Sequence, residues 1–542
     1  MKHHVKSLLT AYFLCLFPLF LSAQKQAPAQ KQADAAFAQH ARKMYSTLYV
    51  LSEMYVDTVN AKALTDKAID AMIKELDPHS DYMTAEELAE MNEPLQGGFD
   101  GIGISFNMMN DTLFVVEVIV GGPSEKVGLQ AGDRIMKVDG ENIAGVKMSS
   151  KEVMKRLKGP KGTEVTISVK RRGQQDLIDF VIVRDKIPMY SLDASFMLDK
   201  NIAYIKISRF GATTMDEYHQ AFKELQAQGM KHLILDLQSN GGGYMSTAID
   251  LADEFLTAGK CIVYTEGLHS PRQQANASAK GAFEEGNLVV LIDEFSASSS
   301  EIVSGAVQDW DRGLIVGRRS FGKGLVQRML PLGDGTVIKL TVSRYHTPSG
   351  RCIQKPYDAG DEAYAKDLVD RYNRGEMISA DSIHFPDSLK YHTLTKQRVV
   401  YGGGGIMPDV FVPMDTTRFT PLHRLLVNRG VLNRYCLNYV DDHRSELKNA
   451  YPEADVFIDK FEVSDEMINE MMALAEAEKI SIKDEDRASD KTVLKLQTKA
   501  YMARDLYKTA AYYQVMVPEN EALQKALEIL KTPKLRKEYG LK

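Results

Sequence analysis

Cysteine is scarce in this chain of 542 residues, with only four present. One of them, Cys15, lies in an apolar N-terminal run that we expect to be removed. The remaining Cys261, Cys352 and Cys436 leave at least one thiol unpaired within a single chain, and they show no spacing typical of metal ligands. The sequence therefore excludes a fold that depends on a dense disulfide framework.

Other absences narrow the possible chemistry. None of the 12 histidines stands in a His-Glu-x-x-His arrangement, so zinc-dependent hydrolysis has no support. The formal net charge is −6 and there is no long basic run, which does not favour nucleic acid as a partner. Length and a hydrophobic fraction of 44% indicate several packed globular domains.

The first 23 residues have the pattern of a secretory signal peptide. Met1-Lys-His-His-Val-Lys6 is positively charged, Leu8 to Leu21 is apolar, and Leu21-Ser-Ala23 is a small-residue cleavage site. The apolar run is too short and too clearly ended to favour a membrane anchor. We therefore expect a soluble exported protein.

The most informative stretch runs from Ser296 to Gln327. A buried-strand pattern at 287–293 leads into Ser-Ala-Ser-Ser-Ser-Glu, and Ser-Phe-Gly-Lys-Gly-Leu-Val-Gln follows further on. A serine and a lysine presented in this way can act as nucleophile and base without histidine. Such a lysine needs a pKa below the usual ~10.4, which burial beside apolar side chains such as Phe321 and Leu325 would provide.

These motifs resemble the signature of the C-terminal processing, or tail-specific, serine peptidases. The resemblance implies Ser298 as nucleophile, Lys323 as general base and Gln327 as the residue that orients the lysine. Serine occupies position 299, where the family usually has alanine, and this leaves two hydroxyls to choose between. Spacing favours Ser298, and the other possible nucleophiles are Ser296, Ser299 and Ser300.

A second motif is the glycine-rich turn that ends the apolar segment 233–237. Glycines let backbone N–H groups approach a reacting oxygen closely. The turn resembles the family's Asp-Leu-Arg-x-Asn-Pro-Gly-Gly, with Gly241 in place of proline, and this implies an oxyanion hole made by Gly242 N–H and Ser299 N–H. Asp309 matches an acidic position of the family, and we expect it to support the site rather than to transfer protons.

Residues 97–172 contain short alternating strands and a helix near 152–157, and they resemble a PDZ domain. The resemblance implies a carboxylate-binding loop, which consists of Gly101, Ile102, Gly103 and Ile104. Such a module adds an extended peptide to a sheet edge and captures its terminal carboxylate. We therefore expect protein or peptide substrates with free C-terminal tails; the alternative is a small β domain that serves only as a spacer.

The expected fold is a multidomain α/β protein. A leader and helical region at 24–96 precedes the PDZ domain, an α/β core of the crotonase/Clp-protease-like type covers 173–414 with an insertion at 356–400, and a helical domain covers 415–542. Apolar residues recur at helical spacing in the N-terminal region, from Phe37 to Tyr55. By resemblance, a homodimer through the N- or C-terminal helices is expected.

Three alternative interpretations remain to be weighed. Gly317 to Lys323 fits a phosphate-binding loop, but Gly324 stands where a Mg²⁺-binding hydroxyl is needed, so no nucleotide is expected. A non-catalytic PDZ scaffold on a peptidase-like core would lack serine reactivity. A Ser-His hydrolase would need one of a set of histidines at the cleft, namely His219, His232 or His346.

The function that the sequence favours is an exported serine endopeptidase. It would recognise C-terminal tails through the PDZ domain and cleave with a Ser298–Lys323 dyad, without metal, cofactor or nucleotide. By family resemblance, the expected location is the periplasm.

Overall fold

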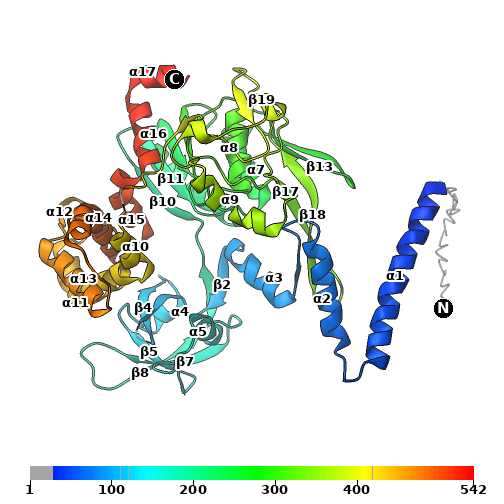
Figure 1. Ribbon diagram of the computed structural model, residues 1–542. Helices are drawn as coiled ribbons and strands as arrows, with labels where there is room; N and C mark the ends of the chain where they lie inside the picture. The colour runs from blue at the N-terminus through cyan, green and yellow to red at the C-terminus, as the bar shows by residue number, and fades with distance from the viewer. Residues whose placement is uncertain (1–27, 110, 120, 418) are drawn as a thin grey trace, which may run out of the picture. The chain divides into compact units, whose positions relative to one another are not determined.

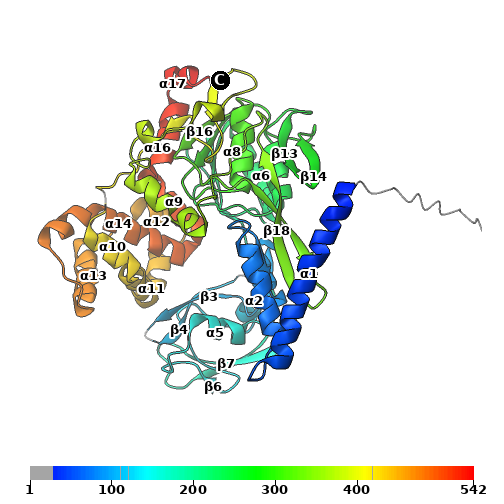
Figure 2. The same cartoon turned by 45° about the vertical axis from the view of Figure 1, so that its right-hand side comes forward.

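The computed structural model describes residues 28–542 except Asn110, Val120 and Arg418. Its helices and strands are shown in Figures 1 and 2. The signal peptide expected over 1–23 and the start of the leader lie outside the described residues.

The chain divides into two compact units, the first of which ends at Glu75. Its described part consists of the helices α1 (Pro28–Met54) and α2 (Ala61–Lys74). The side chain of Asn60 caps α2 by accepting a hydrogen bond from Ala63 N. Large apolar side chains of α1 are exposed, namely Phe37, Met44, Tyr45, Tyr49, Val50, Leu51 and Met54.

The second unit, residues 76–542, contains a mostly parallel sheet. Its strand order is β10-β11-β12-β15-β16-β21, and only the β10–β11 pair in this order is antiparallel. The strands are β10 (Leu192–Met197), β11 (Ile202–Ile207), β12 (His232–Asp236), β15 (Asn287–Ile292), β16 (Leu314–Gly317) and β21 (Val410–Phe411). All residues of β11 and β15 are buried, as in parallel sheets that carry helices on both faces.

Helices cover both faces of this sheet (Figure 1). On one face lie α6 (Thr214–Ala227), α7 (Met245–Asp253) and α8 (Ser299–Asp309). Leu288 and Val290 of β15 point to this face, whereas Val289 and Leu291 point to the other, where α16 (Glu521–Lys531) packs. A helix from the C-terminal region thus completes the core of the sheet.

An antiparallel sheet stands beside this core and carries part of the candidate site. Its order is β1-β18-β13-β14, and β17 also pairs with β18. The strands are β1 (Asp81–Met83), β13 (Cys261–Gly267), β14 (Ser270–Asn276), β17 (Leu325–Pro331) and β18 (Val337–His346). β17 follows Lys323 directly and contains Gln327.

The PDZ-like module is a separate antiparallel sheet with the order β3-β4-β5-β7-β8, and β6 pairs with β5. Its elements are β3 (Ile104–Met109), β4 (Thr112–Val118), α4 (Pro123–Lys126), β5 (Arg134–Val138), β6 (Glu141–Asn142), α5 (Ser150–Leu157), β7 (Glu164–Lys170) and β8 (Ile178–Val183). The sheet therefore continues past Arg172.

Short elements lead into and out of this module. They are α3 (Ala85–Asn92), η1 (Glu93–Leu95), β2 (Gly98–Gly101) and β9 (Asp185–Pro188). β2 and β9 pair antiparallel, so the chain enters and leaves the module at the same place.

The segment 356–400 folds as an extension of the core. It contains α9 (Asp361–Asn373), η2 (Ala380–Ser382), η3 (Asp387–Leu389) and β19 (Lys390–His392), which pairs with β20 (Val399–Tyr401). The buried guanidinium of Arg371 on α9 donates to the backbone carbonyls of Arg319 and Ser320. The insertion is thereby joined to the loop that precedes Lys323.

The C-terminal region is helical, as the sequence predicts. Its elements are α10 (Pro421–Asn428), α11 (Val431–Ala450), α12 (Ala454–Lys460), α13 (Asp465–Ala477), α14 (Asp484–Tyr507), α15 (Thr509–Met516), η4 (Val517–Glu519), α16 and α17 (Pro533–Glu538). Helices α10 to α15 enclose an apolar core of their own. Leu437 of α11 also packs with Phe114 and Val116 of β4. The expected multidomain α/β class with a helical C-terminal region is confirmed.

Candidate active site

Ser298 lies at the junction between β15 and α8, in a strained backbone conformation. Its φ is +55° and its ψ is −110°. Positive φ is uncommon for a residue with a side chain, and such outliers cost about 1–3 kcal/mol, a strain that gathers at functional sites. The strand-turn-helix arrangement expected from the sequence is therefore present, and it presents Ser298 at the first turn of the helix.

The neighbouring serines differ from Ser298 in exposure. Ser296, Ser299 and Ser300 are buried, whereas Ser298 is partly exposed. Their hydroxyls donate to backbone carbonyls: Ser296 Oγ to Leu237 O at 2.8 Å, Ser299 Oγ to Gly243 O at 3.1 Å and Ser300 Oγ to Asn240 O at 2.8 Å. These three hydroxyls fasten the serine turn to the glycine-rich turn. Exposure and bonding thus favour Ser298 as the reactive serine.

Glu301 joins the serine turn to the lysine loop. Its buried carboxylate Oε2 accepts hydrogen bonds from Ser298 N at 2.7 Å and from Lys323 N at 2.9 Å. Its Oε1 accepts from Ser320 Oγ at 2.5 Å and from Gly322 N at 2.7 Å. Burial raises the pKa of Glu301 to about 7, although these hydrogen bonds oppose the increase. Sequence reasoning gave Glu301 no role, because its four partners come from two distant segments.

Tyr345 on β18 makes a second connection between the same two turns. Its hydroxyl lies 2.5 Å from Lys323 O and 3.1 Å from Ser298 O, so the two carbonyls share its proton. The ring is buried. The main chains of Ser298 and Lys323 are therefore held by one carboxylate and one phenol.

The surroundings of Lys323 weaken its hold on a proton. Burial lowers the pKa of Lys323, the charge of Lys339 lowers it further, and the charge of Glu301 opposes the change. Leu325, one of the apolar residues expected beside the lysine, is buried. A lysine of this kind is a better base near neutral pH than an exposed one.

Gln327 contacts a residue that the sequence did not single out. It faces Thr341 across the β17–β18 ladder, and its Nε2 donates to Thr341 Oγ1 at 3.2 Å. Thr341 Oγ1 in turn lies 3.0 Å from Asp77 Oδ1. Asp77 also caps its own turn by accepting from His79 N and Ser80 N. The Asp-Pro-His-Ser segment is thus a turn, as expected, and it also contacts the site.

Histidine lies closer to the lysine than the sequence indicated. His79 Nε2 is 2.8 Å from Tyr364 Oη on α9. Burial lowers the pKa of His79 to about 4, and the charge of Lys323 contributes to the shift. The imidazole is therefore neutral at pH 7.

The histidines considered for a Ser-His hydrolase have other partners. His219 Nε2 is 2.7 Å from Glu254 Oε1, His232 contacts Asn287, and the ring of His346 stacks on Tyr264. Within the described residues, no hydrogen bond joins any of the three to Ser298. Their positions give no support to a Ser-His mechanism.

Gly242 lies directly against the serine turn. Its φ is +106°, and a Cβ atom there would lie 2.9 Å from Ser298 Cβ and 3.1 Å from Ser299 N, so only glycine fits. Its N–H donates to Oδ1 of the buried Asn240 at 2.9 Å. Ser299 is the first residue of α8, where backbone N–H groups have no partner inside the helix. The two amides expected in the oxyanion hole are adjacent, and that of Gly242 is shared with Asn240.

Asp309 lies at the other end of α8 in a fully buried ion pair. Its Oδ1 is 2.7 Å from Arg351 Nη2, and its Oδ2 accepts from Ser349 N at 2.9 Å. Both partners of the pair have 0% side-chain exposure. These contacts orient α8 and suit a supporting role.

The expected carboxylate-binding loop leads into β3, an outer strand of its sheet. Ile102 O accepts hydrogen bonds from Ser124 N and Ser124 Oγ, and Gly103 has a positive φ of +78°. Within the described residues, β3 pairs only with β4. Its other edge is therefore open to an added strand, and Ile104 packs at the margin of the module's core.

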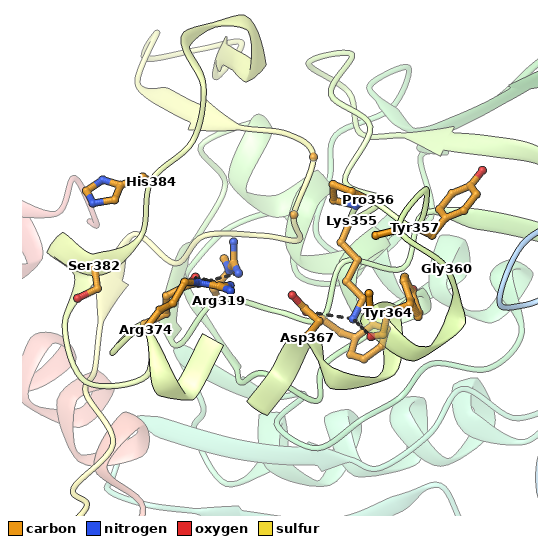
Figure 3. A pocket seen from close by; sticks show the side chains of 16 residues that line it. Arg319, Lys355, Pro356, Tyr357, Gly360, Tyr364, Asp367, Arg374, Ser382 and His384 are labelled. Carbon is orange, nitrogen blue, oxygen red and sulfur yellow. Dashed lines mark hydrogen bonds and ion pairs between the residues drawn. The ribbon is translucent and has the colours of Figure 1, made fainter. Parts of the chain in front are cut away.

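A cavity of about 480 Å³ lies between the lysine loop and the insertion (Figure 3). Lys355 spans it, with Nζ 3.0 Å from Asp367 Oδ2 and over the rings of Phe321 and Tyr364. Because Phe321 is two residues from Lys323, the insertion forms part of the surroundings of the site. The insertion had been given no catalytic role, and the contacts suit a structural one.

Two searches over the described residues returned no candidates. They contain no cluster of three or more His, Cys, Asp or Glu side chains suited to a metal ion. None of the described helices has the length and apolar character needed to cross a bilayer.

Family models match successive parts of the chain. Peptidase family S41 matches residues 201–360, and a PDZ domain matches residues 101–181. The N-terminal domain of the activating protease CtpB matches residues 19–87. A family of unknown function matches residues 422–508, within the helical region.

Curated relatives agree with these matches. A carboxy-terminal-processing protease of Bartonella bacilliformis is 35% identical over 366 residues, which cover 67% of this chain and 81% of the relative. The chain belongs to the family of C-terminal processing serine peptidases. A CtpA-like serine protease of Staphylococcus epidermidis is 32% identical and covers 64% of this chain, with 69% of that protein matched. A solved photosystem II D1 C-terminal processing protease is 26% identical, covers 67% of this chain and 86% of its own, and has a TM-score of 0.36.

The family resemblance inferred from the sequence is thereby confirmed. So are the serine-type peptidase class and the presence of a PDZ domain beside the peptidase core. The conclusion rests on the match to the relative from Bartonella bacilliformis together with the S41 and PDZ family models.

Proposed function

We propose that this protein is an exported endopeptidase that binds the unstructured C-terminus of a protein in its PDZ domain and cleaves the chain with a Ser298–Lys323 dyad. The observation that carries the proposal is the shared support of the two residues. Glu301 Oε2 accepts from the backbone N–H of both, and Tyr345 Oη contacts the carbonyl of both. Two turns held in this way keep a nucleophile and a base in fixed register.

The reaction follows the usual steps of acyl transfer. Ser298 Oγ attacks the scissile carbonyl carbon while the neutral Lys323 amine takes the hydroxyl proton. The resulting ammonium then protonates the leaving amine, and water attacks the acyl-enzyme with Lys323 again as the base. Neither a metal nor a nucleotide is needed.

The developing oxyanion would be stabilised by two backbone amides. Ser299 N–H stands at the positive end of α8, which favours negative charge. Gly242 N–H would join it by sharing its proton between Asn240 Oδ1 and the oxyanion, since catalytic hydrogen bonds often tighten only when substrate is bound.

Tail recognition would use the open edge of β3. A substrate C-terminus would add as a strand to this edge, with its carboxylate on the N–H groups of the loop Gly101–Ile104. The partly buried Ile104 favours an apolar final residue.

Export and assembly complete the proposal. The N-terminal pattern of charge, apolar run and small residues supports secretion, and we place the enzyme in the periplasm by family resemblance. A homodimer through the terminal helices is supported by the exposed apolar side chains of α1. Sedimentation of the mature chain tests this assembly, because a monomer at all concentrations would contradict it.

The decisive experiment is cleavage of an unstructured protein with an apolar C-terminal tail, with chelator present throughout. Ser298→Ala and Lys323→Ala are expected to abolish cleavage, because each removes an atom that takes part in bond making or proton transfer. The matched control is Ser304→Ala, since Ser304 is a buried serine of α8 whose hydroxyl donates to Ser300 O. Histidine modification should leave the wild type active.

Two outcomes would contradict the proposal. Cleavage that survives Lys323→Ala but not histidine modification would indicate a Ser-His enzyme. A wild type that binds the tail without cutting it would indicate a peptide-binding scaffold.

A further inference from the structure

Thr341 stands between the proposed lysine-orienting residue and a carboxylate far away in the sequence. Its Oγ1 is 3.2 Å from Gln327 Nε2 and 3.0 Å from Asp77 Oδ1. The backbone N–H of Thr341 donates to Ser80 Oγ at 3.0 Å, which fixes β18 to the Asp77 turn. The three side chains form a continuous chain of hydrogen bonds within the second unit.

Asp77 is built to act only as an acceptor. Its buried carboxylate accepts from His79 N at 2.9 Å, from Ser80 N at 3.0 Å and from Ser80 Oγ at 2.6 Å, in addition to Thr341. Burial tends to raise the pKa of Asp77, but these hydrogen bonds together lower it below the usual value. The carboxylate is therefore ionised at neutral pH and has no proton to donate.

The protons in the chain can then be counted. Thr341 has a single hydroxyl proton, and Asp77 can only accept, so that proton points to Asp77. The oxygen of Thr341 must then accept from Gln327, which turns the NH₂ group of the amide toward Thr341. The amide oxygen Oε1 is left on the opposite side. A reversed amide would place two acceptor oxygens against each other, with no proton between them.

We propose that Asp77 and Thr341 are positioning residues that fix the orientation of the Gln327 amide, so that its Oε1 accepts a hydrogen bond from the Lys323 amine. The inference rests on the proposed Ser-Lys mechanism and names what sets the direction of its base. Gln327 is held from outside by the β17–β18 ladder and by Thr341. The lysine therefore meets a carbonyl oxygen rather than an NH₂ group.

The orientation matters because Lys323 becomes an ammonium when it takes the serine proton. An acceptor oxygen stabilises that ammonium and aims its remaining protons, whereas an NH₂ group would repel it. The other groups that face Lys323 are Glu301, Lys339 and the neutral His79. None of them is arranged by Thr341.

The test replaces the hydroxyl of Thr341 by a methyl group of the same size. Thr341→Val should reduce kcat for tail cleavage by roughly 10- to 100-fold, a part of the contribution that a well-placed base makes. The acid limb of kcat/KM against pH should also move to lower pH, because the ammonium loses an acceptor and the pKa of Lys323 falls. Thr341→Ser keeps the hydroxyl and should restore both the rate and the profile.

Controls separate positioning from general damage. Thr498→Val is a matched change at a buried threonine of α14, whose Oγ1 has no hydrogen-bond partner among the described residues. It should leave the rate and the pH profile unchanged. Gln327→Ala alone and combined with Thr341→Val forms a double-mutant cycle, in which the second change should add almost nothing if Thr341 acts through Gln327. Thr341→Ala makes the same test if Thr341→Val does not fold.

The possible failures are distinguishable. If wild type is inactive, or if Lys323→Ala retains activity, the proposed function itself fails. If wild type depends on Lys323 but Thr341→Val keeps the wild-type rate and pH profile, only the positioning role is overturned. A lower rate with an unmoved profile and additive effects in the cycle would also overturn it.

Discussion

The turns that carry Ser298 and Lys323 differ sharply from the strand that begins at Ile104. The backbone amides of both turns end on one buried carboxylate, and a buried tyrosine contacts both carbonyls. The outer edge of β3, by contrast, has no partner strand among the described residues. Chemistry requires atoms to be held in place before substrate arrives, whereas strand addition requires unpaired backbone groups.

This comparison predicts that changes at the two regions affect different kinetic constants. Substitutions near Ser298 should lower kcat, because they disturb a rigid arrangement. Substitutions at β3 should raise KM for tailed substrates and leave kcat unchanged, since the bonds broken there serve binding alone.

The largest effect is expected at the glycine-rich turn. Gly242→Ala would force a Cβ atom to within 2.9 Å of Ser298 Cβ and 3.0 Å of Ala297 O, at a φ that disfavours side chains. We expect kcat to fall by about 10²- to 10³-fold, the range for loss of an oxyanion donor. Gly241→Ala is the matched control, because nothing lies within 4 Å of its Cβ position. Equal activity of the two variants would refute the close packing of Gly242 on the serine turn.

A smaller effect is expected from Glu301, together with a distinctive pH dependence. The ionised carboxylate can accept all of its N–H partners, but after protonation one oxygen must donate. With a Glu301 pKa of about 7 and a lowered Lys323 pKa, both groups gain protons as pH falls, and both changes reduce activity. The acid limb of kcat/KM should therefore be steeper than a single protonation allows.

Glu301→Gln removes one of these two titrations. The amide NH₂ would face a backbone N–H, so we expect kcat to fall by roughly tenfold or more, and the acid limb should become a single-proton curve. Stability should respond in the opposite direction in wild type. Because the folded pKa of Glu301 lies above its value of 4.5 in an unfolded chain, its contribution is complete below pH 4.5 and is lost as pH rises through about 7. A single-proton limb in wild type would contradict the assignment.

The smallest effect is expected at the PDZ edge. Ile104→Gln should raise KM for a protein with an apolar tail by about tenfold, since one apolar contact of this size contributes about 1–2 kcal/mol. Cleavage of a short peptide that lacks a recognisable tail should not change. Val181→Gln, at an exposed position on the opposite outer strand of the same sheet, provides the control. A change in kcat rather than KM would show that the PDZ domain acts on the chemistry itself.

Much of the architecture could be read from local patterns. The apolar spacing in the N- and C-terminal regions predicted helices, and helices α1 and α14 occupy those segments. The strand before Ser296 and the helix after it follow from a β-branched run and a turn rich in serine. Packing across the sheet was not predictable in the same way, because α16 contacts β15 from more than 200 residues away.

The site divides along the same line. The order and spacing of the motifs identified Ser298, Lys323 and Gln327 in the sequence, since each motif is a short continuous stretch. The choice among four neighbouring serines required their exposure and hydrogen bonds. Glu301 stood within a quoted motif, yet its role is visible only where its carboxylate meets the lysine loop.

By itself, the sequence determined the family, the order of the domains and the identity of the reactive pair, because these are written in contiguous residues. Only the tertiary structure decided which groups hold that pair, since their partners come from segments far apart in the chain. Thr341 and Asp77 are 264 residues apart, and they meet because β18 packs beside the Asp77 turn. A hydrogen bond depends on distances of about 3 Å in space, and folding sets those distances.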